Sequence, residues 1–150
     1  IQLQKFLAGL RGTHFKDVDG ISMRAALEFI QPEQTVHYGA SLARYVEALP
    51  KVEQPVTVTG NAQRGAEHYV TCVACHGADG KGNRELEAPP LAGQADWYLL
   101  KQLEKYQAGA RGHDPRDVQG QQMAAMSKVL PDEQAVKDVI AFIQTLANKK

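Results

Sequence analysis

The 150-residue sequence contains few cysteines, no excess of charge of either sign and no long apolar run. Its two cysteines, Cys72 and Cys75, exclude a framework of several disulfides. The 17 basic residues balance the 17 acidic ones, and this neutrality argues against a nucleic-acid partner. Apolar runs such as 139–143 are far too short to span a bilayer. With 43% hydrophobic residues, the chain is long enough for one globular domain or two small ones.

Both cysteines belong to one short motif, Cys72-Val73-Ala74-Cys75-His76, which has the form C-x-x-C-H. This pattern is typical of c-type haem attachment. Two thiols three positions apart lie on one face of a helical turn, so both can bond to one edge of a porphyrin. The histidine that follows can then bind the iron through a ring nitrogen. The motif therefore predicts a covalent haem c, attached through the two cysteines and ligated by the histidine.

Three other interpretations of the cysteine pair are open. A thioredoxin-type redox pair requires a strand–helix context, and no alternating strand pattern precedes Cys72. A zinc site requires a second pair of ligands, which is missing. An ordinary disulfide of a secreted protein is the third alternative. The adjacent His76 and the glycine-rich loop after it favour haem attachment over all three.

An internal repeat organises the rest of the chain. Residues 1–28 align without a gap with residues 101–128, at a constant offset of 100. Twelve of these 28 positions are identical, which is too many for chance. In the first copy the identical residues are Gln2, Leu3, Lys5, Ala8, Gly9, Arg11, Gly12, Asp17, Val18, Gly20, Met23 and Ala25. We therefore expect two similar units.

Each copy is predicted to form a helix, a long loop and a second helix. In the second copy the first helix covers 97–108 and ends at Gly109, and the loop covers 111–122. The second helix begins near Pro131 and carries an apolar stripe. The similarity continues more weakly into this last helix, where Phe142, Ile143 and Leu146 resemble Tyr45, Val46 and Leu49.

A short helix is predicted over 61–70, directly before the cysteines. Gly65 and Tyr69 are one turn apart on it. A glycine at this position would let another helix approach closely, and we expect Phe142 of the last helix to be the partner.

The predicted fold class is all-α, with one complete domain and the C-terminal half of a second, similar domain. Residues 61–150 form the complete domain, and residues 1–49 form the half domain, whose own C-x-x-C-H is not in this chain. Residues 50–60 hold two prolines and are predicted to be an extended linker. Because helical periodicity begins at Ile1 with no start signal before it, we expect residues upstream.

A haem bound by one histidine either takes a sixth ligand or stays open for chemistry. Met123 and Met126 both precede the last helix, and a thioether ligand favours ferrous iron, which suits an electron carrier. We predict that Met123 is the ligand, because the repeat preserves it as Met23. Met126 corresponds to Ala26 and is expected to pack in the core. Met23 is predicted to be a ligand only if an upstream haem is present.

The proximal imidazole is expected to donate its second N–H to a backbone carbonyl. Pro89 and Pro90 are both candidates for that carbonyl, because prolines fix the backbone of the loop in which they lie. Trp97 and Tyr98 are expected to pack against the haem.

The remaining charged residues near the site are predicted to have no specific role. Lys101, Lys105 and Arg111 are expected to lie on a solvated face rather than to meet haem propionates or an acidic partner. The other histidines are assigned no role; they are His14, His37, His68 and His113.

These motifs together resemble a known family. The segments 72–80 (CVACHGADG), 90–94 (PLAGQ) and 98–103 (YLLKQL) are similar to a class I cytochrome c domain of the cytochrome c4 type. The resemblance covers 61–147, and the repeat extends it over 1–49. It implies the cytochrome c fold.

The resemblance also implies the roles of five residues. Cys72 and Cys75 correspond to the thioether cysteines, His76 to the proximal ligand and Met123 to the distal ligand. Pro89 corresponds to the proline whose carbonyl holds the proximal histidine.

Members of this family are dihaem electron carriers of the bacterial periplasm, with two domains facing each other across a pseudo-twofold axis. The resemblance therefore implies a periplasmic protein, not an enzyme, that passes single electrons between redox partners such as a membrane oxidase or dehydrogenase complex. One haem c is expected, and a second one only in an upstream region. Two alternatives are a haem enzyme of the peroxidase or thiosulfate-oxidising type and a cytochrome subunit of a larger membrane oxidoreductase complex.

Overall fold

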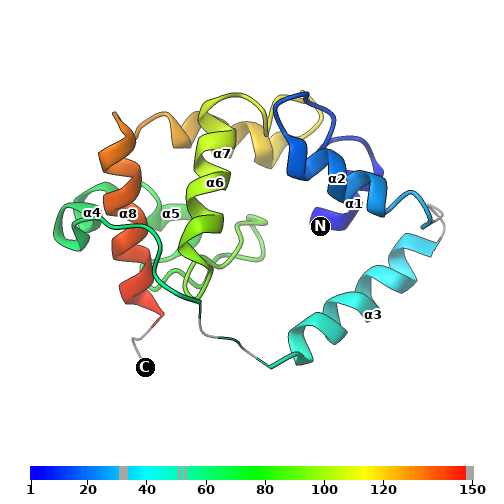
Figure 1. The fold of residues 1–150 in the computed structure, drawn as a ribbon, viewed down its shortest axis with the longest axis horizontal. Coiled ribbons are helices and arrows are strands. Elements are labelled where there is room, and N and C mark those ends of the chain that lie inside the picture. The colour runs from blue at the N-terminus through cyan, green and yellow to red at the C-terminus, as the bar shows by residue number, and fades with distance from the viewer. Residues whose placement is uncertain (31–33, 51, 53, 148–150) are drawn as a thin grey trace.

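The computed structural model describes residues 1–30, 34–50, 52 and 54–147, and helices joined by loops make up this part of the chain (Figure 1). The helices are α1 (Gln2–Leu7), α2 (Val18–Ala26), α3 (Thr35–Ala48), α4 (Ala62–Tyr69), α5 (Val73–His76), α6 (Asp96–Gln107), α7 (Val118–Ser127) and α8 (Glu133–Leu146). Within this part of the chain the only β interaction is an isolated bridge between Asn83 and Ala88. The all-α prediction is confirmed.

Some of the predicted segments extend beyond what the structure describes. Residues 51 and 53 of the expected linker and residues 148–150 of the expected second unit lie outside the described residues, as does the side chain of His37. Among the helices that are described, none combines the length and the apolar character needed to cross a membrane.

The core of the second unit forms where α4 crosses α8 (Figure 1). A Cβ atom at Gly65 would overlap the backbone oxygen of Asp138 and lie 2.9 Å from Cβ of Phe142, so the two helices touch at the glycine. One turn later the rings of Tyr69 and Phe142 pack with their centroids 5.1 Å apart. The predicted approach of Phe142 to Gly65 is therefore confirmed. The buried residues of α8 in this core are Ala135, Val136, Val139, Ile140, Ile143 and Leu146.

The loop predicted over 111–122 is wrong in its second half, because α7 begins at Val118. The Asp117 side chain accepts a hydrogen bond from the Gly120 N–H at 3.0 Å and so caps the helix. A Cβ at Gly120 would overlap this carboxylate, which explains why a glycine stands inside a helix here. In the first copy Asp17 caps α2 in the same way, accepting from the Gly20 N–H at 3.1 Å.

The start of the last helix also differs from the prediction. Pro131 lies before the helix, and α8 begins at Glu133 after its N-cap residue Asp132. The Asp132 side chain accepts a hydrogen bond from the Ala135 N–H at 2.8 Å. A carboxylate cap satisfies a free N–H at the helix end, so it sets the first residue more strongly than the proline does.

The end of the 50–60 segment is bound to α6. One carboxylate oxygen of Asp96 accepts hydrogen bonds from the N–H groups of Thr57 and Val58, at 2.6 and 2.7 Å. Burial opposes the charge on Asp96, but these N–H donors outweigh it and hold the pKa of Asp96 below its usual value. Val58 itself is buried in the core of the second unit. This segment therefore fixes the start of α4 relative to α6.

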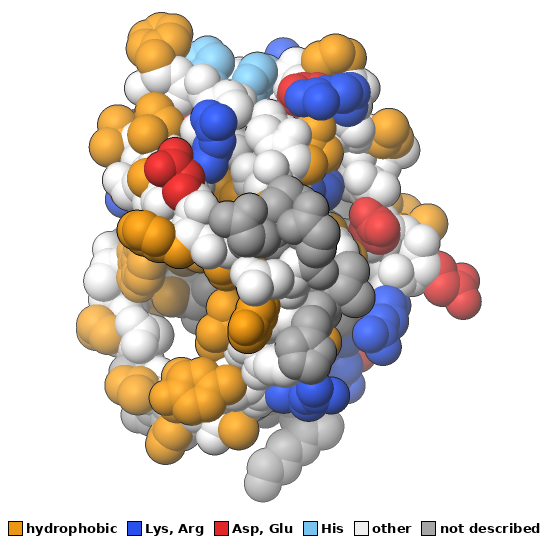
Figure 2. All heavy atoms as spheres, turned by 90° about the vertical axis from the view of Figure 1, so that its right-hand side faces the viewer, with side chains coloured by type: hydrophobic (Ala, Val, Ile, Leu, Met, Phe, Trp, Pro, Cys, Tyr) orange, Lys and Arg blue, Asp and Glu red, His pale blue; other side chains and the backbone are white. Residues whose placement is uncertain are grey.

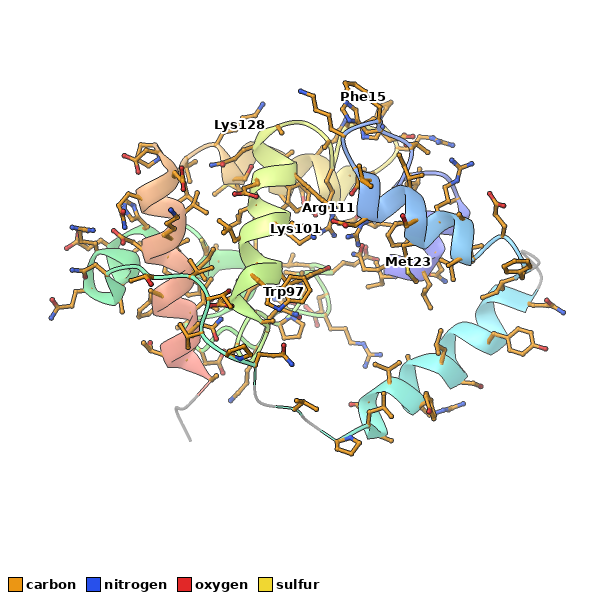
Figure 3. The ribbon with its side chains drawn as sticks, viewed as in Figure 1. Phe15, Met23, Trp97, Lys101, Arg111 and Lys128 are labelled. Atoms are coloured by element: carbon orange, nitrogen blue, oxygen red, sulfur yellow. The ribbon has the colours of Figure 1, made fainter. Side chains whose placement is uncertain are left out.

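The first copy of the repeat has the arrangement of the second. In the first copy α1 contacts α2 and α3, and in the second copy α6 contacts α7 and α8. Side chains of the two copies then meet in the region between α6 and the α1–α2 pair, where Figure 3 shows Lys101 and Arg111. Lys5 binds Asp117 at 2.5 Å, and its counterpart Lys105 binds Asp17 at 2.6 Å.

The arginines of the repeat form a second reciprocal set. Arg11 donates to Gln2 at 2.8 Å and to Gln102 at 3.2 Å. Arg111 donates to Gln102 at 2.6 Å and to Gln2 at 3.1 Å. Each of these contacts recurs with both residues replaced by their counterparts in the other copy. The two copies are therefore related by a pseudo-twofold arrangement in these contacts.

The prediction of a solvated face is consequently wrong for Lys105 and Arg111. The Lys105 side chain is only 11% exposed because it reaches into the first copy to bind Asp17. Arg111 lies over the ring of Tyr106 at 4.6 Å and binds both glutamines. Lys101 does lie at the surface, where its 49%-exposed side chain pairs with Asp19.

Candidate haem site

The C-x-x-C-H motif forms a single helical turn, α5, whose N-cap residue is Cys72. The backbone N–H of His76 donates to the carbonyl of Cys72 at 2.9 Å, and Gly77 ends the turn with a φ of 79°. One turn therefore holds both thiols and the imidazole on one short rigid segment. Both thiols are free, and no strand precedes α5 in the part of the chain that the structure describes.

The imidazole of His76 is 7% exposed, and its Nδ1 lies 2.9 Å from the carbonyl oxygen of Pro89. A carbonyl oxygen only accepts hydrogen bonds, so we assign the proton to Nδ1. Burial lowers the pKa of His76, and the bond to Pro89 offsets part of this lowering. The ring is then neutral at pH 7, and Nε2 keeps a lone pair with which to bind a metal. Of the two proline candidates, the structure joins Pro89 to the histidine.

The loop after α5 brings the proline to the imidazole. It folds back at Gly82, whose N–H donates to the carbonyl of His76 at 2.8 Å. A Cβ at Gly82 would lie 2.5 Å from the carbonyl oxygen of Ala88 and 2.7 Å from the carbonyl carbon of Pro89. Only glycine leaves room for this approach, and its φ of 79° also favours glycine. The glycine-rich sequence after the motif is thus what positions the Pro89 carbonyl.

The protonation of the first cysteine argues against a redox-active pair. Burial raises the pKa of the Cys72 thiol; a hydrogen bond involving Thr71 opposes this, and the nearby Cys75 adds to the increase. A redox-active C-x-x-C motif needs the opposite shift, because the thiolate is its reactive form. Cys72 is therefore an uncharged thiol at neutral pH. Cys75 is exposed, so this edge of the motif faces outward.

Tyr69 connects the core of the second unit to the motif. Its hydroxyl donates to the carbonyl of Gly77 at 2.9 Å. Burial raises the pKa of Tyr69 to about 12, so the hydroxyl keeps its proton and remains a donor. The residue that packs on Phe142 in the core thus also fixes the end of α5.

The methionine candidates lie on equivalent helices. Met123 is half-buried on α7, and Met23 lies on α2, where Figure 3 labels it; its side chain is 38% exposed. The packing role predicted for Met126 is wrong, because this side chain is 40% exposed on α7.

Two aromatic residues begin α6. The rings of Trp97 and Tyr98 meet edge to face with their centroids 5.9 Å apart. Trp97 is 47% exposed, and Figure 3 shows it at the start of α6. It therefore presents apolar surface near the beginning of the helix rather than filling the core.

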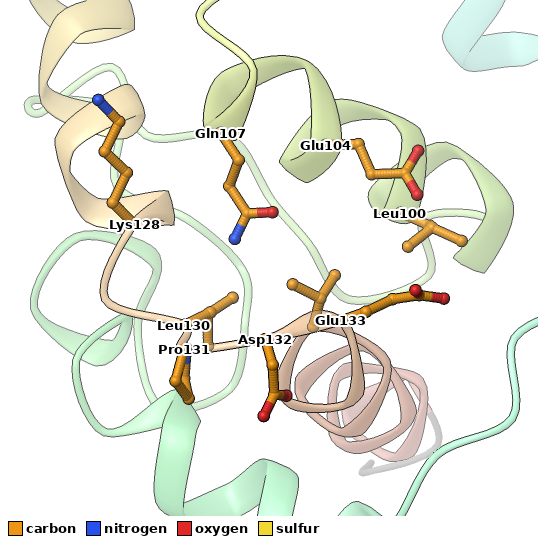
Figure 4. Close-up of a pocket in the computed structure, with 9 residues that line it drawn as sticks. Leu100, Glu104, Gln107, Lys128, Leu130, Pro131, Asp132 and Glu133 are labelled. Carbon is orange, nitrogen blue, oxygen red and sulfur yellow. The ribbon is translucent and has the colours of Figure 1, made fainter.

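A surface hollow between α6, α7 and α8 does not belong to this site (Figure 4). It is lined by charged and polar side chains such as Glu104, Gln107 and Lys128, and no residue of the C-x-x-C-H motif lines it. Gln107 spans it by donating to the carbonyl of Ser127 at 3.0 Å. The hollow is a gap between helices of the second unit.

The residues present fit a covalently held haem. They supply two free thiols on one turn, a buried neutral imidazole with a bare nitrogen, and a carbonyl that holds its orientation. Sequence reasoning missed the polar contacts between the two copies. A signal for them exists: Gln2, Lys5, Arg11 and Asp17 are polar and identical to their counterparts in the repeat, although nothing in one unit alone requires this.

Comparison with known proteins gives a consistent result. The family model described as cytochrome c matches residues 62–147. Cytochrome c4 of Stutzerimonas stutzeri is 35% identical over 88 residues, which cover 57% of this chain and 41% of that protein. A protein named thiosulfate dehydrogenase electron acceptor, from Stutzerimonas stutzeri (strain A1501), is 43% identical over 84 residues, covering 55% of this chain and 38% of that protein.

A shorter relative is covered almost completely. Cytochrome c-554(548) of Halomonas halodenitrificans (strain ATCC 12084 / NCIMB 8669) is 35% identical over 83 residues, which are 55% of this chain and 93% of that protein. The aligned part of the chain thus spans about two fifths of the two longer relatives and nearly all of the shorter one.

Proposed function

The chain belongs to the cytochrome c family, and we propose that it transfers single electrons between redox proteins through a haem c held by Cys72, Cys75 and His76. Covalently attached haem c is the cofactor of this family and of this chain. The observation that carries the proposal is the 2.9 Å contact between Nδ1 of His76 and the carbonyl of Pro89. It leaves the second ring nitrogen free to bind iron.

Each residue of the site has a distinct role in this proposal. The thiols of Cys72 and Cys75 would hold the porphyrin covalently, and His76, oriented by Pro89, would bind its iron. Met123 would be the sixth ligand. A haem held in this way would supply an iron that changes between the ferric and ferrous states, and a thioether ligand favours the ferrous one. Because both iron-binding side chains would belong to this chain, little of the protein would have to rearrange when an electron is taken up.

The partners and the location follow from the same proposal. Electron donors and acceptors are expected to be redox proteins, such as a dehydrogenase or a membrane oxidase complex. One relative is named as the electron acceptor of a thiosulfate dehydrogenase, which supports a carrier that serves an enzyme rather than an enzyme itself. We place the protein in the periplasm, because thioether attachment of haem takes place outside the cytoplasmic membrane in this family.

Loss of one methionine tests the ligand. In Met123→Ala the near-infrared methionine-to-iron charge-transfer band of the oxidised protein should disappear, and the reduction potential should fall. Met126→Ala is the matched control, because Met126 lies on the same helix and is 40% exposed; it should leave both unchanged. A band that persists in Met123→Ala would refute the assignment. A native protein without the band would favour a haem enzyme with an open iron.

We further propose that residues 1–49 are the C-terminal half of a second cytochrome c unit. The helices α1, α2 and α3 repeat the arrangement of α6, α7 and α8. On this proposal Met23 is the ligand of a second haem, wherever that haem is present. The intact mass of the native protein measures the number of covalent haems: a single haem would remove the role of Met23, and two would support it.

A further inference from the structure

The helix that carries Met123 is held at its start by a residue of the other copy. Lys5, on α1, donates to the carboxylate of Asp117 at 2.5 Å and to the side-chain oxygen of Gln119 at 3.3 Å. The side chains of Lys5 and Asp117 are only 12% and 4% exposed. The contact therefore joins two segments 112 positions apart through a charge pair largely shielded from water.

The acceptor of this contact is the residue that starts α7. The oxygen of Asp117 that binds Lys5 also accepts the Gly120 N–H at 3.0 Å. The first turn of α7 is packed tightly, because a Cβ at Gly112 would overlap the Gly120 carbonyl and a Cβ at Gly120 would overlap Asp117. A shift of the Asp117 carboxylate therefore shifts the first turn of the helix on which Met123 lies.

Removing the lysine would leave a buried carboxylate without its partner charge. Such a group is strongly unfavourable, so the carboxylate would turn towards water. This movement weakens the cap and loosens the start of α7. The exposed pair between Lys101 and Asp19 lies at the same boundary but has little of this effect, because both side chains are about half exposed.

We propose that Lys5 is a positioning residue for the iron ligand Met123, so that the first copy tunes the haem of the second. This inference rests on the proposed function, in which Met123 is the sixth ligand. The pseudo-twofold arrangement supplies the reciprocal contact, since Lys105 binds Asp17 at 2.6 Å and Asp17 caps α2, the helix of Met23. Each copy thus holds the methionine helix of the other.

The test compares variants of the whole haem-loaded protein. In Lys5→Met the charge-transfer band should weaken and disappear at a lower temperature than in the wild type, and the reduction potential should fall. The reason is that a loosened Met123 stabilises ferrous iron less. Lys101→Met is the control of the same residue type at the same boundary, and it should leave the band and the potential unchanged.

A double variant separates positioning from simple loss of stability. Asparagine caps helices well and is uncharged, so Lys5→Met combined with Asp117→Asn removes the unpaired buried charge and keeps the cap. The band and the potential should therefore return towards the wild-type values. If Lys5→Met does not fold, Asp117→Asn is measured alone. Asparagine should keep the cap at the start of α7, so the charge-transfer band of Met123 should change only slightly.

Two results would overturn the inference. One is a Lys5→Met protein that unfolds more easily but has an unchanged band and potential while folded, which would make Lys5 merely structural. The other is complete loss of the charge-transfer band in the double variant. Where Lys5→Met does not fold, complete loss of the band in Asp117→Asn has the same meaning. A failure of the proposed function is distinguished by Met123→Ala: if the band persists there, the ligand assignment fails whatever Lys5 does.

Discussion

The last helices of the two copies have the same length and opposite surroundings. Both α3 and α8 contain 14 residues, and both carry an apolar stripe. In α8, Ile143 and Leu146 are each 3% exposed, because α4 covers this helix. Their counterparts, Val46 in α3 and Leu49 directly after it, are 56% and 46% exposed. The amphipathic pattern is therefore shared, and the difference lies in whether a second helix covers it.

Exposed apolar side chains extend from α3 onto the segment before it. Figure 2 looks onto the side of the molecule that carries the first copy and shows hydrophobic side chains spread over this face. A groove there is lined by Phe29, Ile30, Tyr38, Leu42 and Tyr45. Isolated exposed apolar residues are common, but several apolar side chains that line one groove are typical of a surface that another element covers. This supports the proposal that the first copy is half of a unit.

The second unit, residues 61–150, is predicted to depend on its haem although α4 covers α8. A domain of under a hundred residues buries little apolar surface, and the porphyrin supplies part of the missing core. In Cys72→Ala/Cys75→Ala, we expect loss of covalent haem and of cooperative unfolding for residues 61–150. Circular dichroism during heating and acid–acetone extraction measure both. A haem-free protein with native helicity and a cooperative transition would contradict this prediction.

An added side chain should change stability in opposite directions at a glycine of the second unit and at a glycine of the first copy. Gly65→Val places atoms into the backbone of α8, which cannot move aside, so we expect a loss of ~4 kcal/mol or more in the free energy of unfolding. Gly39 lies on α3, and a Cβ there meets nothing within 4 Å. Gly39→Ala should therefore stabilise the protein, by up to ~1 kcal/mol through helix propensity. Equal destabilisation in both variants would show that α3 is packed as tightly as α8.

Truncation of equivalent apolar residues should give the next largest difference. Ile143→Ala removes a 3%-exposed side chain from the core, and we expect a loss of ~3 kcal/mol in the free energy of unfolding. Val46 is 56% exposed, so Val46→Ala should change the free energy of unfolding by ~0.5 kcal/mol or less. Denaturant unfolding of the haem-loaded protein measures both values. If the native protein contains a partner for α3, the loss for Val46→Ala will rise towards that for Ile143→Ala.

The carboxylate that binds α8 to the start of α4 should make stability depend on pH. Asp138 accepts hydrogen bonds from Arg64 at 2.7 Å and from the Asn61 N–H at 2.7 Å, and these hold its pKa well below the usual value. Its contribution is therefore present at neutral pH and is lost as the pH falls below about 4. Asp138→Asn should be less stable than the wild type at pH 7 by a smaller amount than the preceding variants, and the difference should shrink in acid.

Thermal melting of both proteins between pH 7 and pH 3 measures this effect. Asp132→Asn is the matched control on the same helix, because asparagine keeps the N-cap and Asp132 is exposed. At pH 7 its melting temperature should stay close to that of the wild type. If the difference in melting temperature between Asp138→Asn and the wild type widened in acid, it would contradict the lowered pKa of Asp138.

Much of the site was predictable because it depends on short spacings. The C-x-x-C-H motif needs one helical turn, and the glycine-rich loop returns the chain to the histidine within 13 positions. The start of α7 was not predicted, because Gly120 indicates a loop unless the carboxylate of Asp117 is known to occupy the space beside it. Likewise, periodicity shows that Met126 lies on a helix but not that its side chain faces outward.

The covalent chemistry, the repeat and the apolar stripes can all be read from the amino-acid sequence, because they follow from residue types at separations of a few positions or from direct identity. The burial of one stripe and the removal of certain charges from water depend instead on how the helices pack. Lys5 and Lys105 have the same local sequence pattern as surface lysines, but they are largely shielded from water where carboxylates 112 and 88 positions away face them. Local periodicity cannot predict contacts between residues so far apart in the sequence, because these contacts form only when the two copies pack against each other.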